Sequence, residues 1–584
     1  QWWWVASVAL VLMASATTGA SMRLSGKVQL RDWITPAQLR AASGDAALLL
    51  VLVIGSLALR LPDLTTLPYV VHGDEAACAI EALRWLHGDV HSLIDTGWSG
   101  LPVLGYAPPA LLMRVAGVDL WTLRLSTVLI GTATVALLYA LAREVAGRRP
   151  AFIAAALLAV AHIDIQFSRE GFHYIHAPFV VVLTLWLLVR ALWRESVVAA
   201  ALAGTGLSLA LQVYFSARIL YVIVPLFLLA VWLADRKRIA RRARIIGWLM
   251  LSFVLAVGPL GVYFLQNPAP LRDRSAEVLI LNMTPDMRAH LISQFGTANL
   301  AVVIWRQVAA VPLLFGTLTD QSLQYGAHYP LFDPLVAALI LVGFWYALLR
   351  LKQPIYFLLV SWVLLTVVLG VVLTIDMPSW PKVLVMVPVL CLLAALAAEA
   401  LLRWLEGVTL AVAQTLNSAD EVRGWRLAVP VALLVAGLIV YSGAVSVHHY
   451  FVDYPSTVNT DANRTTYTDV GRYLATVPTD TRVVLFSGGD IIWGYPTLQF
   501  FAPQVKGQQV TDAQELVAAL SHRGNELTLV IVTASAMRNF DTMRVTPGEL
   551  PPGRYTARPN VWGRVTFVTY AIAAPAAPMV KVLR

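Results

Sequence analysis

The amino-acid sequence predicts a polytopic α-helical membrane protein with a small α/β domain at its C-terminal end. Of the 584 residues, 58% are hydrophobic and only 13% are charged, whereas soluble proteins average roughly 45–50% apolar and about 25% charged residues. So little charge cannot cover a water-exposed surface of this size, and lipid must therefore be the solvent for most of the chain. The mean hydropathy of +0.69 agrees with this conclusion.

Apolar runs of spanning length recur along the chain as far as residue 446. A helix needs about 20 mostly apolar residues to cross a hydrocarbon core of roughly 30 Å. We expect about twelve such helices, within a range of 11–13. The predicted spans are residues 2–20, 45–62, 120–142, 150–167, 175–193, 197–215, 217–234, 245–266, 331–350, 354–375, 381–402 and 427–446.

These spans divide the chain into three parts. Residues 1–44 form an N-terminal membrane helix and a basic cytoplasmic segment, residues 45–446 the transmembrane domain, and residues 447–584 an extracytoplasmic α/β domain. Because the first residue is Gln, we expect the natural N-terminus to lie upstream or to have been processed. A cleaved signal peptide is the alternative to a first span, although three consecutive tryptophans favour an interfacial anchor.

The basic residues predict the orientation in the membrane. They fill every second loop, and the side that carries them is expected to be cytoplasmic. The basic loop residues are Arg23, Lys27, Arg31, Arg40, Arg143, Arg148, Arg149, Arg190, Arg194, Arg236, Lys237, Arg238, Arg241, Arg242, Arg244, Arg350, Lys352 and Arg403. This distribution explains the net charge of +9 without a nucleic-acid partner. The large loops 63–119 and 267–330 and the C-terminal domain then lie outside the cell membrane, where we also expect the active site.

The C-terminal domain alternates predicted strands with predicted helices, which is typical of an α/β fold. The strands are expected at residues 483–486, 527–533 and 564–571, and the helices at 466–476 and 512–523. Ser487-Gly-Gly-Asp490 follows the first strand, but neither a dinucleotide-binding nor a P-loop pattern completes it, so a plain turn is favoured. We assign this domain to acceptor recognition or to docking of partners in a membrane complex. Cys78 and Cys391 are too isolated to suggest a disulfide framework.

The sharpest candidate site follows the second span, in the stretch His72-Gly-Asp74-Glu75. Two adjacent carboxylates at a helix start can simply be first-turn residues that complement the helix dipole. Just outside a spanning helix they could also take a hydroxyl proton from an acceptor, or help to hold a divalent metal. His72 is a further candidate for lining this site.

A second candidate lies between two spans on the same outer side. Arg169 could hold a phosphate, because its planar fork pairs with two oxygens. Asp164, Glu170 and His173 accompany it and could line the site. The alternative is an interfacial ion pair of Arg169 with Asp164 or Glu170 that closes the helix ends, with His173 an ordinary hydrogen-bonded histidine.

Three shorter outer segments supply weaker candidates. Tyr214 and Arg218 belong to a Tyr-Phe-Ser-Ala-Arg loop, and Lys382 follows Asp376-Met-Pro-Ser-Trp-Pro. The two cations could contact a lipid phosphate or could merely extend to the headgroups. Polar residues before the span 331–350 could line an acceptor groove: Asp320, Tyr325, His328 and Asp333.

These residues resemble those of a known family. The His-Gly-Asp-Glu-Ala stretch from His72 resembles the acidic motif of the GT-C glycosyltransferases. The closer resemblance is to the protein O-mannosyltransferase and aminoarabinose-transferase branch. This branch includes bacterial enzymes described as dolichyl-phosphate-mannose-protein mannosyltransferase-like. Leu123-Arg124-Leu-Ser126, Leu141–Arg149 and Gln166–Glu170 are similar to the family's next span, basic turn and outer loop. The resemblance covers roughly residues 45–235 and is architectural beyond them.

The resemblance implies a GT-C-like architecture and a sugar donor carried on a polyprenyl phosphate, with inversion at the anomeric carbon. By this resemblance Asp74 would be the catalytic base with Glu75 beside it, and Arg169 would be a candidate for binding the donor phosphate. Arg218 and Lys382 are further candidates for that phosphate because of their position at the membrane boundary. The acceptor would be a protein, a lipid or a glycan of the cell envelope. No Asp-x-Asp motif of oligosaccharyltransferases is present, so no required metal or other cofactor is predicted, although a divalent ion at the carboxylates stays open.

Two other functions compete with the glycosyltransferase. A transporter or flippase for a lipid-linked substrate would usually have broken helices and polar groups near the bilayer midplane, whereas these spans are largely free of charge. A non-catalytic scaffold subunit of a membrane complex would keep the fold and use its outer domain for contacts. A shared cavity for the candidate residues would favour the enzyme, and candidate residues packed into protein would favour the scaffold.

Overall fold

The computed structural model describes residues 2–25, 36–236, 242–325, 328–415, 424–458, 460–521, 527–545 and 550–573. The chain forms two compact units. The membrane unit contains Gln1–Thr65 and Arg84–Tyr454, and the sheet unit contains Thr66–Leu83 and Pro455–Arg584. A piece of the first large loop, residues 66–83, thus folds with the C-terminal domain, which the sequence did not predict.

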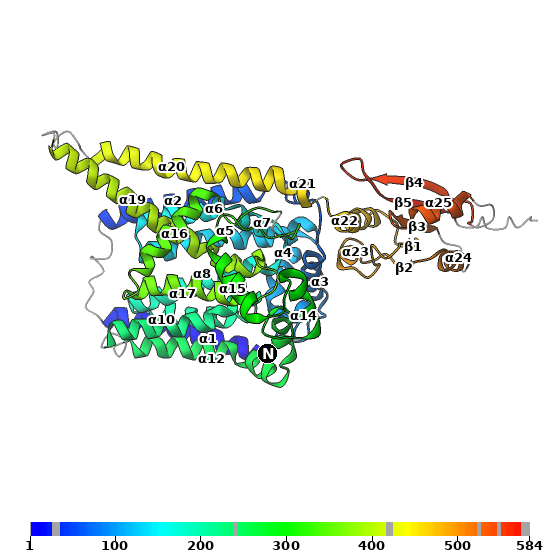
Figure 1. Cartoon of the computed structure of the whole chain (residues 1–584). Coiled ribbons are helices and arrows are strands. Elements are labelled where there is room, and N and C mark those ends of the chain that lie inside the picture. The colour runs from blue at the N-terminus through cyan, green and yellow to red at the C-terminus, as the bar shows by residue number, and fades with distance from the viewer. Residues whose placement is uncertain are drawn as a thin grey trace, which may run out of the picture. The chain divides into compact units, whose positions relative to one another are not determined.

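The membrane unit is mainly helical (Figure 1). Each of the twelve predicted spans contains a helix. The helices in these spans are α1 (Trp2–Ser25), α2 (Pro36–Arg60), α5 (Leu120–Val145), α6 (Arg148–Val160), α7 (His162–Arg169), α8 (His176–Arg194), α9 (Val197–Leu209), α10 (Leu220–Ala234), α12 (Ala243–Gln266), α16 (Pro334–Leu348), α17 (Pro354–Val367), α19 (Val387–Thr415) and α20 (Gly424–His448). The loops carry shorter helices: α4 (Ala107–Ala116), α13 (Ala269–Val278), α14 (Pro285–Phe295), α15 (Leu300–Ala310), α18 (Trp380–Val383) and α21 (Tyr454–Val458).

Not every predicted span is a straight helix of full length. Within the described residues, eight helices are long and apolar enough to cross a membrane, and α6 with α7, bent by 56°, gives a ninth. The remaining three predicted spans contain shorter apolar helices, at Trp4–Thr18, Val197–Leu209 and Pro334–Leu348. Hydropathy averages over a window, so it does not detect where a helix ends inside an apolar run.

Close helix packing builds the core of the membrane unit. Small residues let helix backbones approach in a membrane, and Gly343 of α16 is one of them, because a Cβ there would lie 2.0 Å from the carbonyl oxygen of Leu393 in α19. The most apolar stretch of the span Trp380–Val412, which contains most of α19, is 94% buried, whereas that of the span Val429–Val458 is 11% buried. Helix α19 is therefore a central helix, and α20 presents most of its surface to the surrounding solvent, which for these apolar side chains is lipid.

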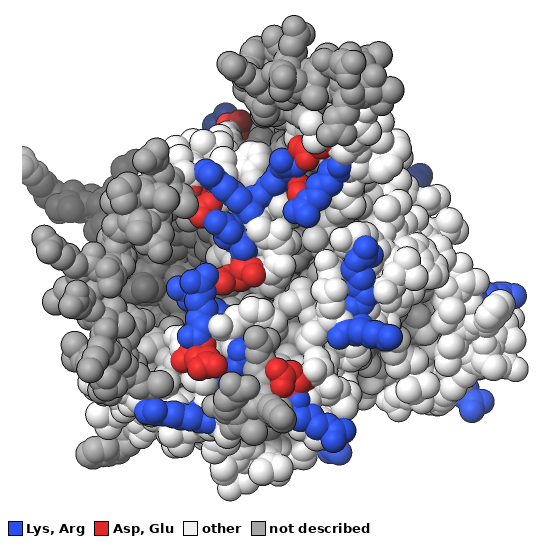
Figure 2. Space-filling model, turned by 90° about the vertical axis from the view of Figure 1, so that its left-hand side faces the viewer, with Lys and Arg blue, Asp and Glu red and all other residues white. Residues whose placement is uncertain are grey.

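The predicted cytoplasmic loops are joined by ion pairs. Asp45 of α2 pairs with Arg143 and Arg148, both at 3.2 Å. Glu144 pairs with Arg190 at 2.7 Å and Arg194 at 3.0 Å. Figure 2 shows basic and acidic side chains interleaved on one face. These contacts bring the loops after α5 and α8 to one side of the membrane unit, as the basic-loop pattern requires. Lys27, Arg31, Lys237, Arg238 and Arg241 and the side chains of Arg23 and Arg40 lie outside the described residues.

The sheet unit is the predicted α/β domain. Its five-stranded sheet has the order β2-β1-β3-β5-β4, with β2, β1 and β3 parallel and β5 and β4 antiparallel to their neighbours. The strands are β1 (Arg482–Phe486), β2 (Gly507–Val510), β3 (Thr528–Thr533), β4 (Arg554–Pro559) and β5 (Val565–Ile572). The polar β2 and the exposed edge strand β4 were not predicted, because neither has the apolar content of a buried strand.

Both faces of this sheet are covered by helices. Alternate side chains of a strand point to opposite faces, so Val483 and Leu485 of β1 pack into one apolar cluster and Val484 and Phe486 into the other. The first cluster includes α22 (Ala462–Leu474) and α23 (Pro496–Phe501), and the second includes α24 (Ala513–Ser521) and α25 (Met537–Val545). The segment that precedes helix α3 (Gly73–His87) attaches to α22 and α23, as described below.

Candidate active site

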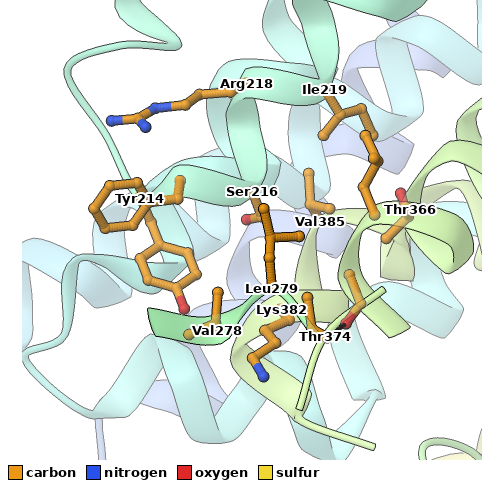
Figure 3. Close-up of a pocket in the computed structure, with 13 residues that line it drawn as sticks. Tyr214, Ser216, Arg218, Ile219, Val278, Leu279, Thr366, Thr374, Lys382 and Val385 are labelled. Atoms are coloured by element: carbon orange, nitrogen blue, oxygen red, sulfur yellow. Dashed lines mark hydrogen bonds between the residues drawn. The ribbon is translucent and has the colours of Figure 1, made fainter. Parts of the chain in front are cut away.

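A cavity of about 270 Å³ lies in the membrane unit between the segment that precedes α10 and the ends of α13 and α17 (Figure 3). Apolar side chains make most of its wall, and two cations also line it. The lining residues are Tyr214, Phe215, Ser216, Arg218, Ile219, Val278, Leu279, Thr366, Leu369, Gly370, Thr374, Lys382 and Val385. The structure therefore brings Lys382 to the same cavity as Tyr214 and Arg218, which the sequence placed together in a different outer loop.

Arg218 is the cation with the most unused hydrogen-bonding capacity at this cavity. Its guanidinium lies 4.3 Å from the ring centre of Phe215, and Nη1 donates only a long 3.4 Å bond to the carbonyl of Leu271. Nε and Nη2 are buried and meet no acceptor in the described part of the chain, and the same is true of the Ser216 hydroxyl. Buried donors without partners cost stability, so this arrangement is suited to receive an oxyanion.

Lys382 reaches the same cavity from α18. Its ammonium donates to the carbonyl of Ile375 at 2.6 Å, which fixes the otherwise flexible side chain. Figure 3 shows Arg218 and Lys382 at different edges of the group of lining residues, with Lys382 next to Leu279. Positive charge at two edges and an apolar middle can hold a molecule that has a phosphate and a hydrocarbon chain.

Tyr214 connects the cavity to an aromatic cluster. Its ring lies 4.5 Å from that of Tyr174 and 5.6 Å from that of His173, measured between centroids. His173 is also flanked by Trp98 at 5.6 Å and Tyr106 at 6.0 Å. His173 is buried among these rings and packs against Tyr214, but it does not line the cavity.

Arg169 is placed differently from what the sequence suggested. It is fully buried; Nη1 donates to the carbonyl of Arg60 at 2.9 Å, Nη2 to that of Pro62 at 2.6 Å, and Nε to the hydroxyl of Tyr450 at 3.2 Å. A cation at these carbonyls satisfies and complements the C-terminal end of α2. Arg169 thus caps a helix and does not line the cavity.

The acidic neighbours of Arg169 also have structural contacts. Asp164 pairs with Arg60 at 2.6 Å, with both side chains buried. Glu170 accepts a hydrogen bond from the hydroxyl of Tyr454 at 2.5 Å. Neither carboxylate is among the residues that line the cavity.

The predicted acceptor groove before α16 is likewise made of structural contacts. Asp320 accepts from the backbone N–H groups of Trp380 and Ser322, both at 2.8 Å, and its burial raises the pKa of its carboxyl. Asp333 caps α16 and accepts from the hydroxyl of Ser442 at 2.7 Å. In sequence, an aspartate that caps a helix and one that binds a substrate look the same.

In the sheet unit, α3 begins with the predicted acidic pair. The backbone N–H of Asp74 donates to Nδ1 of His72 at 3.1 Å, and the Asp74 carboxylate lies 3.6 Å from the same atom. The Asp74 side chain is 29% exposed, whereas Glu75 is fully buried. Burial lowers the pKa of His72, with the Asp74 charge opposing this shift, so His72 is neutral near pH 7. Of the two carboxylates, only Asp74 is accessible to a substrate.

The C-terminal domain holds the segment that carries this pair. Asp469 of α22 accepts from the hydroxyls of Tyr69 at 2.6 Å and Thr566 at 2.7 Å. The Val71 backbone adds two more bonds, its N–H donating to Thr468 at 3.0 Å and its carbonyl accepting from Thr497 at 3.1 Å. Tyr69 and Asp469 are 400 residues apart in sequence, and no local pattern could have revealed the contact.

Among the described residues, no three His, Cys, Asp or Glu side chains lie close enough together to hold a metal ion.

Comparison with known proteins agrees with this architecture. Residues 102–262 match a family described as dolichyl-phosphate-mannose-protein mannosyltransferase. The ArnT of Cupriavidus metallidurans bound to undecaprenyl phosphate is similar with a TM-score of 0.52 and 14% identity, covering 91% of this chain and 99% of that one. An Archaeoglobus fulgidus oligosaccharyltransferase tethered to an acceptor peptide gives a TM-score of 0.51 and 14% identity, covering 90% of this chain and 74% of that one. No curated protein sequence matches the chain.

The chain has the GT-C fold. The resemblance in the sequence predicted this fold from residues 45–235, and the structural similarity extends it to nine-tenths of the chain. The matched family segment contains Arg218 and Tyr214 of the cavity but neither Asp74 nor Lys382. The roles of Asp74 and Lys382 therefore rest on their own surroundings in this structure.

Proposed function

We propose that the protein is a membrane glycosyltransferase that moves a sugar from a polyprenyl-phosphate donor to an extracytoplasmic acceptor with inversion. The observation that carries this proposal is the cavity in the membrane unit. It joins an apolar wall to two cations, and one of them, Arg218, keeps two buried donors without acceptors in the described residues. The GT-C fold and the family match over residues 102–262 support the same class of reaction.

The cavity suits the donor phosphate and the first part of its lipid. Nε and Nη2 of Arg218 can form two parallel hydrogen bonds to phosphate oxygens, and Lys382 adds a second positive charge. Leu279, Leu369 and Val385 offer the apolar surface that the polyprenyl chain needs. The phosphate gains negative charge as the bond to the sugar breaks, and cations placed at that oxygen stabilise the transition state.

The proposed reaction is a direct displacement. The acceptor hydroxyl oxygen attacks the anomeric carbon opposite the phosphate, a new glycosidic bond forms, and the bond to the phosphate oxygen breaks. Asp74 receives the hydroxyl proton, because it is the accessible carboxylate at the start of α3. Polyprenyl phosphate leaves with the electron pair, and inversion follows from attack on the opposite face. Glu75, which is fully buried, supports the helix start in this scheme.

The bend between α6 and α7 is the observation that favours a transporter, since transporters use broken helices. However, polar groups at this break are paired with protein groups and not with a substrate. Nη1 of Arg60 donates to the carbonyl of Ala159 at 2.9 Å, and Arg60 also pairs with Asp164. The burial of Arg169 matches the expectation for a scaffold subunit. The cavity at Arg218 and Lys382 is the feature that a scaffold does not need.

The test is transfer of labelled sugar from a panel of polyprenyl phosphates by the full chain in lipid nanodiscs, with membrane extract as acceptor. We expect transfer by the wild type and none by Asp74→Asn, which keeps the shape of the side chain but cannot act as a base. Donor binding by Asp74→Asn should be unchanged, and this shows that the variant is folded. Transfer by Asp74→Asn at the wild-type rate would remove Asp74 from the base role. Absence of both binding and transfer in the wild type would contradict the proposed function.

A further inference from the structure

The turn between β4 and β5 holds apolar side chains out of the sheet unit. Asn560 accepts hydrogen bonds from the backbone N–H groups of Trp562 at 3.0 Å and Arg564 at 3.1 Å, and Gly563 adopts a positive φ of 76°. These bonds fix the turn. Val561 is nevertheless 68% exposed and Trp562 48% exposed. Two apolar residues on an ordered turn are therefore accessible from outside the sheet unit.

The same hairpin is strongly basic. Residues 550–573 contain three arginines, Arg554, Arg558 and Arg564, and no acidic residue. Arg564 is exposed and adjoins the tip. A tryptophan beside cations is typical of a surface at the level of lipid headgroups, where the indole ring is partly in apolar and partly in wet surroundings and the cations meet phosphates.

Two cavities place this tip beside the points where the chain enters the sheet unit. One, of about 360 Å³, is lined by Leu67, Tyr69, Pro455, Val561 and Trp562 among others. The second, of about 340 Å³, is lined by Pro455, Ser456, Thr460, Trp562 and Arg564. Trp562 also packs edge-on against Tyr69, with 4.9 Å between ring centroids.

Both entry points are close in sequence to spanning helices. Leu67 follows the end of α2 at Arg60 by seven residues, and Pro455 belongs to the last turn of the span Val429–Val458. This span has 30 residues, whereas about 20 residues are enough to cross the hydrocarbon core. The helix is therefore long enough to extend from the headgroups of one leaflet to those of the other, and its last turns then lie at the level of the headgroups. The tip thus shares cavities with two residues that are each close in sequence to a spanning helix.

We propose that the Val561–Trp562 tip of the β4–β5 hairpin docks on the membrane surface, with Trp562 among the lipid headgroups and Arg564 paired with anionic lipid phosphates. This anchor fixes the height of the sheet unit above the bilayer, and with it the segment of residues 66–83 that belongs to this unit. The proposal does not depend on the transfer reaction.

The experiment uses the full chain in nanodiscs that contain anionic phosphatidylglycerol. Both native cysteines, Cys78 and Cys391, are buried, so Val561→Cys can be labelled selectively with an environment-sensitive dye. Val517→Cys on α24, whose side chain is 42% exposed, is the matched control. We expect a blue-shifted emission at position 561 and quenching by headgroup-level spin-labelled lipid about twice that at position 517.

Three results would overturn the proposal. Equal emission and quenching at positions 561 and 517 would place the tip in water. A blue shift at position 561 without lipid quenching would show that protein covers the tip. A blue shift at position 561 that appears only when a glycan acceptor is added would show that the tip binds carbohydrate.

The substitution Arg564→Gln, added to Val561→Cys, tests the contact with lipid phosphates. It should lower the quenching at position 561 in anionic nanodiscs and leave the quenching in neutral nanodiscs unchanged. An equal loss of quenching in both would contradict the lipid-phosphate contact.

Discussion

Arg218 differs from the other buried arginines of the membrane unit in the partners of its guanidinium. Arg60 pairs with Asp164, and Arg169 donates to the carbonyls of Arg60 and Pro62 at the end of α2 and to the hydroxyl of Tyr450. Nε and Nη2 of Arg218 are instead buried and have no hydrogen-bond acceptor in the described part of the chain. At the scale of single residues, this difference is the reason for proposing Arg218, and not Arg60 or Arg169, as the arginine that binds the donor phosphate.

We therefore expect Arg218→Gln to weaken binding of polyprenyl phosphate about 10- to 100-fold, because a hydrogen bond to a charged group contributes about 1.5–3 kcal/mol. Arg218→Lys keeps the charge but loses the paired donors, and it should recover only part of the affinity. The measurement is a binding titration in nanodiscs. Arg306→Gln is the control, since Arg306 is an exposed arginine of α15 that does not line the cavity. Equal affinities of Arg218→Gln and Arg306→Gln would contradict the assignment.

At the scale of helices, the bend between α6 and α7 shows how a polar side chain can replace a helix hydrogen bond. No proline occurs at the break, and Ala161 adopts an extended conformation there. The carbonyl of Ala159, which the break leaves without its helical partner, accepts from Arg60 instead. The Arg60–Asp164 pair then neutralises the charge that this bond brings into the core.

Breaking this pair on one side should destabilise the protein strongly, because the remaining charge stays buried. We expect Arg60→Met to cost about 3–5 kcal/mol and to lower the melting temperature in detergent. The double variant Arg60→Met with Asp164→Leu should recover part of the loss, since it leaves no buried charge. A melting temperature of Arg60→Met equal to that of the wild type would show that the pair is not needed at the bend.

A second element-scale effect involves α22 and the segment before α3. Asp469 binds Tyr69 and Thr566 at once, and burial raises the pKa of its carboxyl while these hydrogen bonds oppose the shift. We expect Asp469→Asn to loosen the segment that leads to Asp74. The transfer rate should fall several-fold while donor affinity stays unchanged. Thr476→Val, which removes an exposed hydroxyl of the same region, is the control.

A merely structural role of Asp469 would give a different pattern. In that case the melting temperature would fall, and the transfer rate per folded molecule would equal that of the wild type. Tyr69→Phe removes only the hydroxyl that donates to Asp469, so it should reproduce the lower rate with less effect on folding. A Tyr69→Phe enzyme with unchanged rate would contradict the positioning of Asp74 by this contact.

At the scale of the whole molecule, much of the architecture could be predicted because lipid imposes a simple rule. A backbone that crosses a membrane must satisfy its own hydrogen bonds, so apolar runs of sufficient length become helices, as all twelve predicted spans did. The ion pairs of Asp45 and Glu144 with alternate basic loops follow the orientation pattern. Strands β1, β3 and β5 had enough apolar content to be recognised as well.

The candidate site was predictable only in part. Arg169, Arg218 and Lys382 have the same signature in sequence, a cation at a membrane boundary, and only the fold shows that two of them line a cavity while the third caps α2. Asp74 and Glu75 differ only in burial, which depends on packing. The attachment of residues 66–83 to the C-terminal domain rests on contacts such as Tyr69 with Asp469, which no local pattern encodes.

The proposed glycosyltransferase function depends most on the cavity beside Arg218 binding the lipid-linked donor. The most direct test is photo-crosslinking of a polyprenyl phosphate that carries a diazirine next to its phosphate, with the modified residues mapped by mass spectrometry. We predict labelling within residues 214–219, 278–279 and 366–385, and a loss of that labelling in Arg218→Gln. Labelling confined to other segments, unchanged by Arg218→Gln, would contradict the central claim.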